Sequence, residues 1–484
     1  MADNIQYAGQ FSIGDVKLFT ASGNTLDIGN TVSAINIYED IFKSSISGDI
    51  TITDTNNLIM EAPIVGQEYL GFKIITPGLD NVAIDYTDNV FTITRIINKV
   101  SSQPGVQVFS LEFCSPEGLR NYRVRTSKSY TDSIDAIVED LLTSKFYINS
   151  KKTLFIEPTK GIRKIVAPNS PPFRLINQLK VDAISKKHNS PHYMFYENIR
   201  GIHFRTLDSL YAQKSIGNFN TGDSGSFDVA KKGPGNIEAA FKTAIRFQQN
   251  GNNDMLRNTV SGLLASNILT HDIYSKSFKY DDFEYHNDFY KNNRVNYENT
   301  GKDNPIYAEN PIDEFDNTVS QFTDSKIHLQ PTSTVSTIEL DSLGLPTVIT
   351  GKDAQYYDTK TKSYPYTPNN VSKTMLSRQS KVAELTNGMS IVLEVHGTTT
   401  ITAGNMINFS MPVTGAEHSG DKFDKYYSGK YLITGVRHMF DITQKKHKCL
   451  LSCIKDSINS ELPMNDLALE PKAERGGLIT DFYI

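Results

Sequence analysis

The stretch Phe91-Thr92-Ile93-Thr94-Arg95-Ile96 and its counterpart Tyr431-Leu432-Ile433-Thr434-Gly435-Val436 decide how this chain is organised. Both alternate apolar and polar residues, which is the pattern of a half-buried β-strand. The two segments are 340 positions apart, and Leu111 and Leu451 are separated by the same offset. A second predicted strand is therefore repeated at the same spacing as the first. Two repeated strands with one spacing favour a duplicated β unit over a chance alignment of short apolar strands. Such a unit presents two near-equivalent surfaces, from which symmetric assemblies are built.

A third passage extends the repeat upstream of the strand pair. Val65-Gly66-Gln67-Glu68-Tyr69 resembles Ala403-Gly404-Asn405-Met406-Ile407, at an offset of 338 positions. In the first copy we expect a hairpin of Phe91–Val100 with Val106–Cys114, preceded by a strand from Glu68 to Ile75.

Composition limits the classes of protein to which the chain can belong. Its 484 residues predict about three domains, and its net charge of −5 argues against a protein that coats nucleic acid. The first residues carry neither a basic region nor an apolar core, so we expect no signal peptide. No apolar run approaches the length of a membrane span. We therefore expect a soluble chain, made in a cytoplasm.

The order of patterns predicts an α+β, mainly β fold. A helix is expected to open at Ser129-Tyr130-Thr131-Asp132 with Ser129 as its cap, and a second one at Ser170-Pro171-Pro172. The predicted intervals are a first β domain (1–118), an α+β module (119–212), a linker (213–236), a second β domain (237–285 with 371–456, including a helix over 371–388), a polar, loop-rich insertion (286–370) and a C-terminal tail (457–484).

Cysteine and histidine raise the question of a metal site near the end of the chain. The three cysteines Cys114, Cys449 and Cys453 are too few for a disulfide framework. Cys449 and Cys453 are four apart on a predicted strand and share a face, so they form half of a metal site with His438 and His447 or serve as small buried hydrophobes. We favour the second interpretation because no Cys-x-x-Cys pair exists, and we predict no metal and no cofactor.

No enzyme motif is found in the sequence, and we predict neither a catalytic residue nor an enzymatic activity. His188 and His192 are spaced like metal ligands on a helix, but Pro191 between them favours solvated loop histidines. His203 alternates with Phe204 on a predicted strand, which favours a side chain that faces solvent or a partner.

Clusters of charge suggest surface features more than chemistry. Paired carboxylates occur at Glu39-Asp40, at Asp281-Asp282 with Glu284, and at Asp313-Glu314. Glycosidase chemistry needs two carboxylates in one cleft, and a solvated face is the simpler explanation. The basic run Lys445-Lys446-His447-Lys448 predicts an exposed hairpin tip, with contact to phosphate or to an acidic partner as the alternative.

The arrangement of parts resembles the central baseplate hub protein of T4-like contractile-tail bacteriophages. The resemblance rests on the opening β unit, on Pro172-Phe173-Arg174-Leu175-Ile176-Asn177 with Tyr193-Met194-Phe195-Tyr196-Glu197, and on the helix 371–388 before Gly404-Asn405-Met406-Ile407-Asn408-Phe409. It covers most of 1–285 and 371–456. The stretch 286–370 departs from it, because it is longer and more polar.

The resemblance implies a homotrimer in which each chain supplies two similar β-barrel-like tube domains, with the α+β module between them and the long insertion in the second. Six quasi-equivalent domains would then join a sixfold tail tube protein to a threefold central spike protein. Other baseplate proteins would bind at the periphery of this virion component, and DNA would pass through the lumen without specific binding. The alternatives are a virion-associated cell-wall hydrolase and a monomeric glycan- or receptor-binding β protein. Partner-binding residues stay unknown at this stage.

Overall fold

A computed structural model describes most of the chain and shows a mainly β protein with few helices. The described residues are 5–55, 64–79, 82–221, 237–249, 254–272, 277–296, 303–307, 327–332, 372–413 and 423–460. Asp313-Glu314 and most of the predicted insertion lie outside them.

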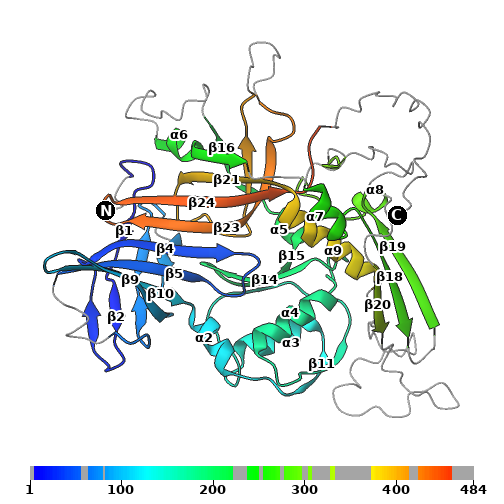
Figure 1. Ribbon diagram of the computed structural model, residues 1–484, viewed down its shortest axis with the longest axis horizontal. Coiled ribbons are helices and arrows are strands. Elements are labelled where there is room, and N and C mark those ends of the chain that lie inside the picture. Colours follow the sequence, from blue (N-terminus) through cyan, green and yellow to red (C-terminus); the bar gives the residue numbers. More distant parts are fainter. Residues whose placement is uncertain are drawn as a thin grey trace, which may run out of the picture.

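One large sheet of thirteen strands forms the body of the molecule and contains both copies of the repeat (Figure 1). Its main path runs β17-β21-β24-β23-β4-β5-β10-β9-β6-β2-β3, with β16 and β22 attached through β23. The bounds are β2 (Lys17–Phe19), β3 (Thr25–Asp27), β4 (Val32–Asp40), β5 (Ser47–Asp54), β6 (Tyr69–Gly71), β9 (Phe91–Gln103), β10 (Val106–Cys114), β16 (Ser215–Asn220), β17 (Ala244–Gln249), β21 (Met389–His396), β22 (Met406–Ser410), β23 (Gly429–Asp441) and β24 (Lys446–Lys455).

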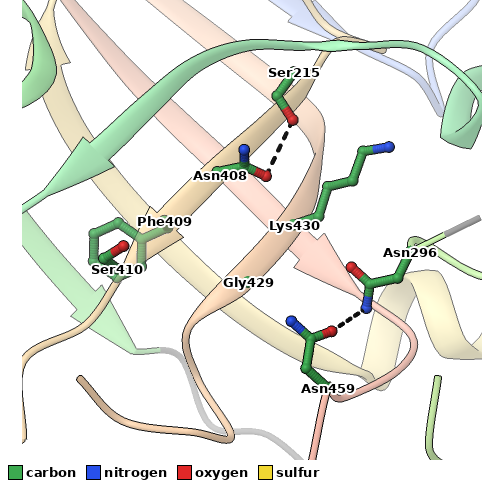
Figure 2. A pocket seen from close by; sticks show the side chains of 8 residues that line it. All are labelled: Ser215, Asn296, Asn408, Phe409, Ser410, Gly429, Lys430 and Asn459. Atoms are coloured by element: carbon green, nitrogen blue, oxygen red, sulfur yellow. Dashed lines mark hydrogen bonds between the residues drawn. The ribbon is translucent and has the colours of Figure 1, made fainter. Parts of the chain in front are cut away.

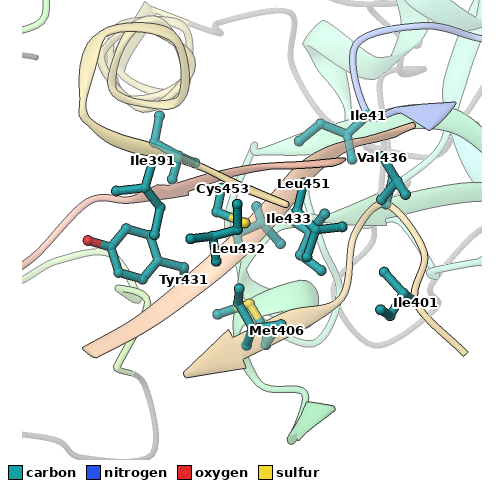
Figure 3. Packing of buried hydrophobic residues seen from close by; sticks show 14 of the residues in the cluster. Ile41, Ile391, Ile401, Met406, Tyr431, Leu432, Ile433, Val436, Leu451 and Cys453 are labelled. Carbon is teal, nitrogen blue, oxygen red and sulfur yellow. The ribbon is translucent and has the colours of Figure 1, made fainter. Parts of the chain in front are cut away.

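Each half of this sheet has its own apolar core. Strands such as β5 and β21 alternate buried and partly exposed residues along their whole length, as their sequences predict. Phe72, Phe91 and Phe113 stack together in the core of the first half. Figure 3 shows the second core, where Ile433 and Leu451 pack between β22 and the rest of the sheet.

The α+β module packs below the sheet in the view of Figure 1 and has a core of its own. The elements are α2 (Pro116–Arg123), β11 (Ser129–Asp132), α3 (Ile134–Thr143), β12 (Leu154–Ile156), β13 (Arg163–Val166), α4 (Pro172–Asp182), β14 (Tyr193–Asn198), β15 (Gly201–Thr206) and α5 (Leu207–Tyr211). Strands β14 and β15 form a hairpin, and the helix predicted to begin at the prolines is confirmed. The predicted helix start at Ser129 is wrong, because residues 129–132 pair with β13 and Ser133 is the N-cap.

A separate three-stranded sheet lies to one side, against the long helix α9 (Ser372–Asn387). It consists of β18 (Ala265–Asp272), β19 (Ser277–Glu284) and β20 (Ile327–Thr332), with α7 (Met255–Val260) and α8 (Tyr285–Phe289) nearby. The sequence placed residues 265–284 in the second β unit, but among the described residues their ladders run only to one another and to β20. Periodicity identified the strands and could not reveal their partners.

Three further expectations differ from the structure. The predicted strand from Glu68 to Ile75 is two strands, β6 and β7 (Lys73–Ile75), and β7 belongs to a small sheet with β1 (Ser12–Ile13) and β8 (Ile84–Asp85). Residues 215–220 of the predicted linker pair with β22. Ile458, in the predicted tail, is buried and bridges to Asn304. Within the described residues, no helix is both long and apolar enough to cross a membrane.

Gly48 lies where β5 passes closest to its neighbours, and this generates the first prediction. A Cβ at Gly48 would stand 2.3 Å from the Asn36 carbonyl oxygen and 2.3 Å from the Phe113 ring. We expect Gly48→Ala to lower the free energy of unfolding by about 1–3 kcal/mol, because a packed core resists added volume. Chemical denaturation measures the change. Gly14→Ala is the matched control, since its Cβ would meet only ordinary contacts at 3.5 Å or more; equal losses for both variants would contradict the prediction.

Candidate functional site

The repeated hairpin has the same register from Phe113 to Ser110 and from Cys453 to Leu450, including the same irregularity, whereas beyond Ser110 the first copy has two further irregularities that the second lacks. Phe113 pairs with Ile93 and Cys453 pairs with Ile433, and in each case the next pair skips one residue on the longer strand. The skipped residue is a threonine both times. Thr94 Oγ1 donates to the Glu112 carbonyl oxygen at 3.2 Å, and Thr434 Oγ1 donates to that of Ser452 at 3.1 Å. A shared β-bulge with a shared hydrogen bond confirms the duplication predicted from the sequence.

The flanking strands are duplicated as well, which the sequence did not reveal. β5 pairs with β10 as β21 pairs with β24, so that Ile50 opposite Leu111 corresponds to Leu393 opposite Leu451. β4 and β17 complete the two units, and each carries a one-residue bulge at its beginning, at positions 33 and 245. Loops of different length separate these strands, so the offset changes from strand to strand and no constant spacing marks them.

The turn before the hairpin corrects the register of the upstream repeat by one residue. The Glu68 carbonyl oxygen accepts from Ile93 N at 2.9 Å, and that of Asn405 accepts from Ile433 N at 2.9 Å. Each side chain also closes its own turn, because Val65 N donates to Glu68 Oε1 and Thr402 N donates to Asn405 Oδ1. Glu68 therefore corresponds to Asn405, whereas an offset of 338 matched it to Met406.

A single antiparallel ladder joins the two units into one sheet. β23 pairs with β4 from Gly435 opposite Asp40 to Asp441 opposite Ala34. β23 corresponds to β9, and β4 corresponds to β17. The seam therefore pairs the outer hairpin strand of the second unit (β23) with the outer flanking strand of the first unit (β4). Among the described residues, no strand pairs with the outer edge of β9 beyond residue 92, and β17 ends the sheet. The sheet thus ends in two outer edges: that of β9, which corresponds to the edge of β23, and that of β17, which corresponds to the edge of β4.

Glu39 is a buried carboxylate at this seam and links three parts of the chain. Its Oε1 accepts from Ile199 N at 2.9 Å, and its Oε2 accepts from Ala403 N at 2.7 Å. His438 of β23 lies on the same side, with Nε2 3.7 Å from Glu39 Oε1. Glu39, which the sequence showed only as one of a pair of neighbouring carboxylates, is therefore a buried structural residue. Hydrogen bonds to the charged form are what allow a carboxylate to remain inside.

A second buried network fastens the α+β module to the first β unit. Lys152 Nζ donates to Glu117 Oε2 at 2.8 Å and also to Glu197. Glu197 Oε2 in turn accepts from Ser115 Oγ at 2.7 Å and from Ile46 N at 3.1 Å. Burial alone would lower the pKa of Lys152, but its two carboxylate partners raise it, so the ammonium stays charged.

Ser377, His192 and Asp208 stand in an order that resembles a hydrolase triad. His192 Nδ1 lies 3.3 Å from Asp208 Oδ2, and His192 Nε2 lies 3.2 Å from Ser377 Oγ. The predicted solvated histidine is wrong here, because His192 is buried; His188 is half-buried. Asp208 also accepts from Ser190 Oγ at 2.5 Å, and Ser377 sits inside α9 and accepts from Asn292 Nδ2 at 3.2 Å. Ser377 thus serves as a hydrogen-bond link between α9 and the module.

The remaining sequence candidates are structural in the described part of the chain. His203 was expected to face solvent but is buried between Phe155 and Tyr196, with Nε2 3.0 Å from Asn198 Oδ1. Asp281 is buried whereas Asp282 is exposed, as alternation along β19 requires. At the basic turn Lys445 and Lys446 are exposed, as predicted, but His447 is buried beside His438 and Cys449.

The best-defined pocket in the second unit is small and polar (Figure 2). It measures about 320 Å³ and is lined by Ser215, Asn296, Asn408, Phe409, Ser410, Gly429, Lys430 and Asn459. Ser215 Oγ lies 3.1 Å from Asn408 Oδ1, and Asn296 donates to Asn459 Oδ1 at 2.5 Å. Lys430 Nζ donates to the Tyr211 carbonyl oxygen at 3.0 Å. No histidine or carboxylate is among the lining residues, so neither Ser215 nor Ser410 has a general base beside it within the pocket.

Comparison with solved structures finds similar folds among tail proteins. A tail protein from Neisseria meningitidis aligns with 92% of this chain and 97% of its own, at TM-score 0.49 and 10% identity. A 43 kDa tail protein of prophage MuSo2 from Shewanella oneidensis aligns over 92% and 99%, at 0.48 and 8%. An E. coli component of the type VI secretion system, itself similar to T4 bacteriophage tail proteins gp27 and gp5, aligns over 88% and 73%, at 0.40 and 11%.

No protein-family model matches the chain, and neither does any curated protein sequence.

The network around Lys152 generates the second prediction. Lys152→Met removes the cation and leaves the carboxylates of Glu117 and Glu197 buried together, which costs about 3–5 kcal/mol of unfolding free energy. Lys128→Met is the control, because the pair of Lys128 with Asp140 is solvent-exposed and contributes about 0–1 kcal/mol. Denaturant titration at pH 7 measures both variants. A loss below 1 kcal/mol for Lys152→Met would show that the network is not what fastens the module.

Proposed function

We propose that three copies of this chain form a closed ring by repeating the β23–β4 seam between neighbouring chains. The observation that supports this most is the head-to-tail order of the two units within one chain. A joint between two different edges leaves one edge of each kind at the ends, and such heterologous contacts close into a ring when the rotation allows it. Three chains would then supply six equivalent β units.

In the proposed ring, the outer edge of β9 pairs with the outer edge of β17 in the next chain. Val100 corresponds to Met439, because Val100 pairs with Val108 as Met439 pairs with Lys448. Gln248 corresponds to Asn36, because they occupy the same register on β21 and β5. Met439 pairs with Asn36 across the internal seam. The ring therefore places Val100 opposite Gln248 of the neighbouring chain. Both side chains are exposed within one chain.

A ring of six β units around a threefold axis suits a hub in a phage tail baseplate. One face would match a sixfold tail tube and the other a threefold central spike, and the lumen would pass DNA during ejection. The net charge of −5 is compatible with a bore that does not hold DNA. The module and the side sheet against α9 would lie outside the ring and contact other baseplate proteins. This role is mechanical and needs no catalytic residue.

Cysteine cross-linking tests the ring and its register together. A chain that carries Val100→Cys and Gln248→Cys is expected to yield linear dimers and closed trimers on mild oxidation, and nothing larger, on a non-reducing gel. Light scattering of the unoxidised wild type should approach three times the chain mass of 54.1 kDa.

Single-cysteine chains are the controls that separate a ring from a twofold dimer. Val100→Cys alone and Gln248→Cys alone should each stay uncrosslinked, whereas a mixture of the two should give dimers only. Val166→Cys with Gln248→Cys is the matched pair, because Val166 is exposed on the module and away from β9. If the chain with Val100→Cys and Gln248→Cys cross-links no faster than the chain with Val166→Cys and Gln248→Cys, the proposal is overturned. The monomeric binding protein would then be the better hypothesis.

The hydrolase alternative rests on the Ser377–His192–Asp208 arrangement and is tested directly. We expect the purified chain to release no fragments from peptidoglycan and no product from an ester substrate. Any trace of turnover should be equal in the wild type and in Ser377→Ala, because the half-buried hydroxyl serves as a structural link. Turnover that Ser377→Ala abolishes while Ser209→Ala retains it would establish an enzyme.

A further inference from the structure

Three side chains that carry metal-binding atoms converge at the centre of the second β unit. His438 Nδ1 lies 3.2 Å from His447 Nε2, and Cys449 Sγ lies 3.3 Å from each of these nitrogens. All three residues are fully buried. The sequence had grouped Cys449 and Cys453 with both histidines, but Cys453 packs in the apolar core and is not a member of the cluster.

The two strands create this convergence through their register. His438 of β23 stands directly opposite Cys449 of β24, and Phe440 stands opposite His447. Residues two apart on a strand share a face, so all three side chains point to one side of the hairpin. Gly397 makes room for the His447 ring, because a Cβ there would lie 2.4 Å from it. Phe440 stacks on the other side of that ring, at 4.0 Å between centroids.

The triangle of donor atoms has the size of one face of a zinc tetrahedron. Zinc bonds of about 2.0–2.1 Å to nitrogen and about 2.3 Å to sulfur place such ligand atoms about 3.3–3.6 Å apart. Two imidazoles and a thiolate are ligands that suit zinc, whereas calcium, magnesium and manganese favour oxygen ligands. The other two ring nitrogens, His447 Nδ1 and His438 Nε2, lie outside this triangle and are buried without a hydrogen-bond partner within the described residues.

Glu39 provides the remaining charge and orientation. Its carboxylate faces His438 Nε2 at 3.7 Å, on the far side of the ring from the cluster, as in the carboxylate–histidine pairs that support metal ligands. The hydrogen bonds from Ile199 N and Ala403 N fix this carboxylate in place. One divalent cation, one thiolate and one carboxylate sum to zero net charge, so the group is neutral in a buried position.

We propose that His438, His447 and Cys449 bind one zinc ion, with a solvent molecule as the fourth ligand. The ion holds β23 to β24 beside the seam with β4 and acts as a structural clamp. The first β unit has no equivalent, because the positions that correspond to His447 and Cys449 are Gln107 and Phe109. The inference goes beyond the proposed ring and does not depend on it.

Metal analysis of tag-free protein tests the site. Wild type and Cys453→Ser should each retain about one zinc ion per chain after dialysis, and Cys449→Ser should retain at least ~10-fold less. Cys453→Ser is the matched control, because Cys453 is buried on the same strand and lies outside the cluster. A wild type without zinc that also fails to take up added zinc would overturn the proposal, as would equal zinc in all three proteins.

Cobalt replacement decides the question even if Cys449→Ser does not fold. Cobalt(II) added to zinc-depleted wild type should give a thiolate-to-metal charge-transfer band and the visible bands of a tetrahedral ion. Both should persist in Cys453→Ser. Absence of the charge-transfer band in folded wild type would show that the thiol and the imidazoles are joined by hydrogen bonds and bind no metal.

Discussion

The ladder between β23 and β4 is the contact on which the rest of this structure depends. It merges two β units, each with its own apolar core, into one continuous sheet. Edge strands expose unpaired backbone groups, and this seam satisfies two edges at once. Because the joined edges are of different kinds, the same joint remains available at each end of the chain. The proposed ring needs no second kind of contact between β units.

Buried polar groups make the seam specific. Glu39 receives backbone N–H groups from the module and from the second unit, and it faces a histidine of β23. A buried carboxylate without such partners would lower stability by several kcal/mol. A shift of β4 along β23 would therefore lose the hydrogen bonds of Glu39 in addition to apolar contacts. In the same way, Lys152 between Glu117 and Glu197 fixes where the module docks.

Local pattern predicted the strands and helices far better than it predicted their partners. Alternation identified the repeated hairpin, and the prolines at 171 and 172 identified the start of α4. The predicted start of α3 failed because a ladder to β13 captures residues 129–132. The placement of β18 and β19 failed because β18 pairs with β20, which lies within the predicted insertion 286–370. Which sheet a strand joins is decided by contacts that no local window contains.

Polar residues were the hardest to place, and for one physical reason. His192, His203 and Asp281 were assigned to solvent because an isolated polar side chain is costly to bury. Each is buried, and for both histidines the contacts that permit it come from the fold, such as Asp208 for His192 and the rings around His203. The sequence did group Cys449 with His438 and His447, but buried hydrophobes were the favoured interpretation for a related reason. These three residues have no motif spacing and meet only through the register of a hairpin.

The two copies share the backbone register around the common bulge but not the side chains at their edges, and this difference bears on symmetry. Across the internal seam, Arg437 donates to Asn36 Oδ1 at 3.2 Å and lies over the Tyr38 ring. The position in β9 that corresponds to Arg437 is Ile97, since both pair with equivalent residues of the next strand. Seams between chains in the proposed ring would therefore lack this polar contact. Strong seams within chains would alternate with weaker seams between them. The ring would therefore have exact threefold symmetry, and its six β units would be related by approximate sixfold symmetry.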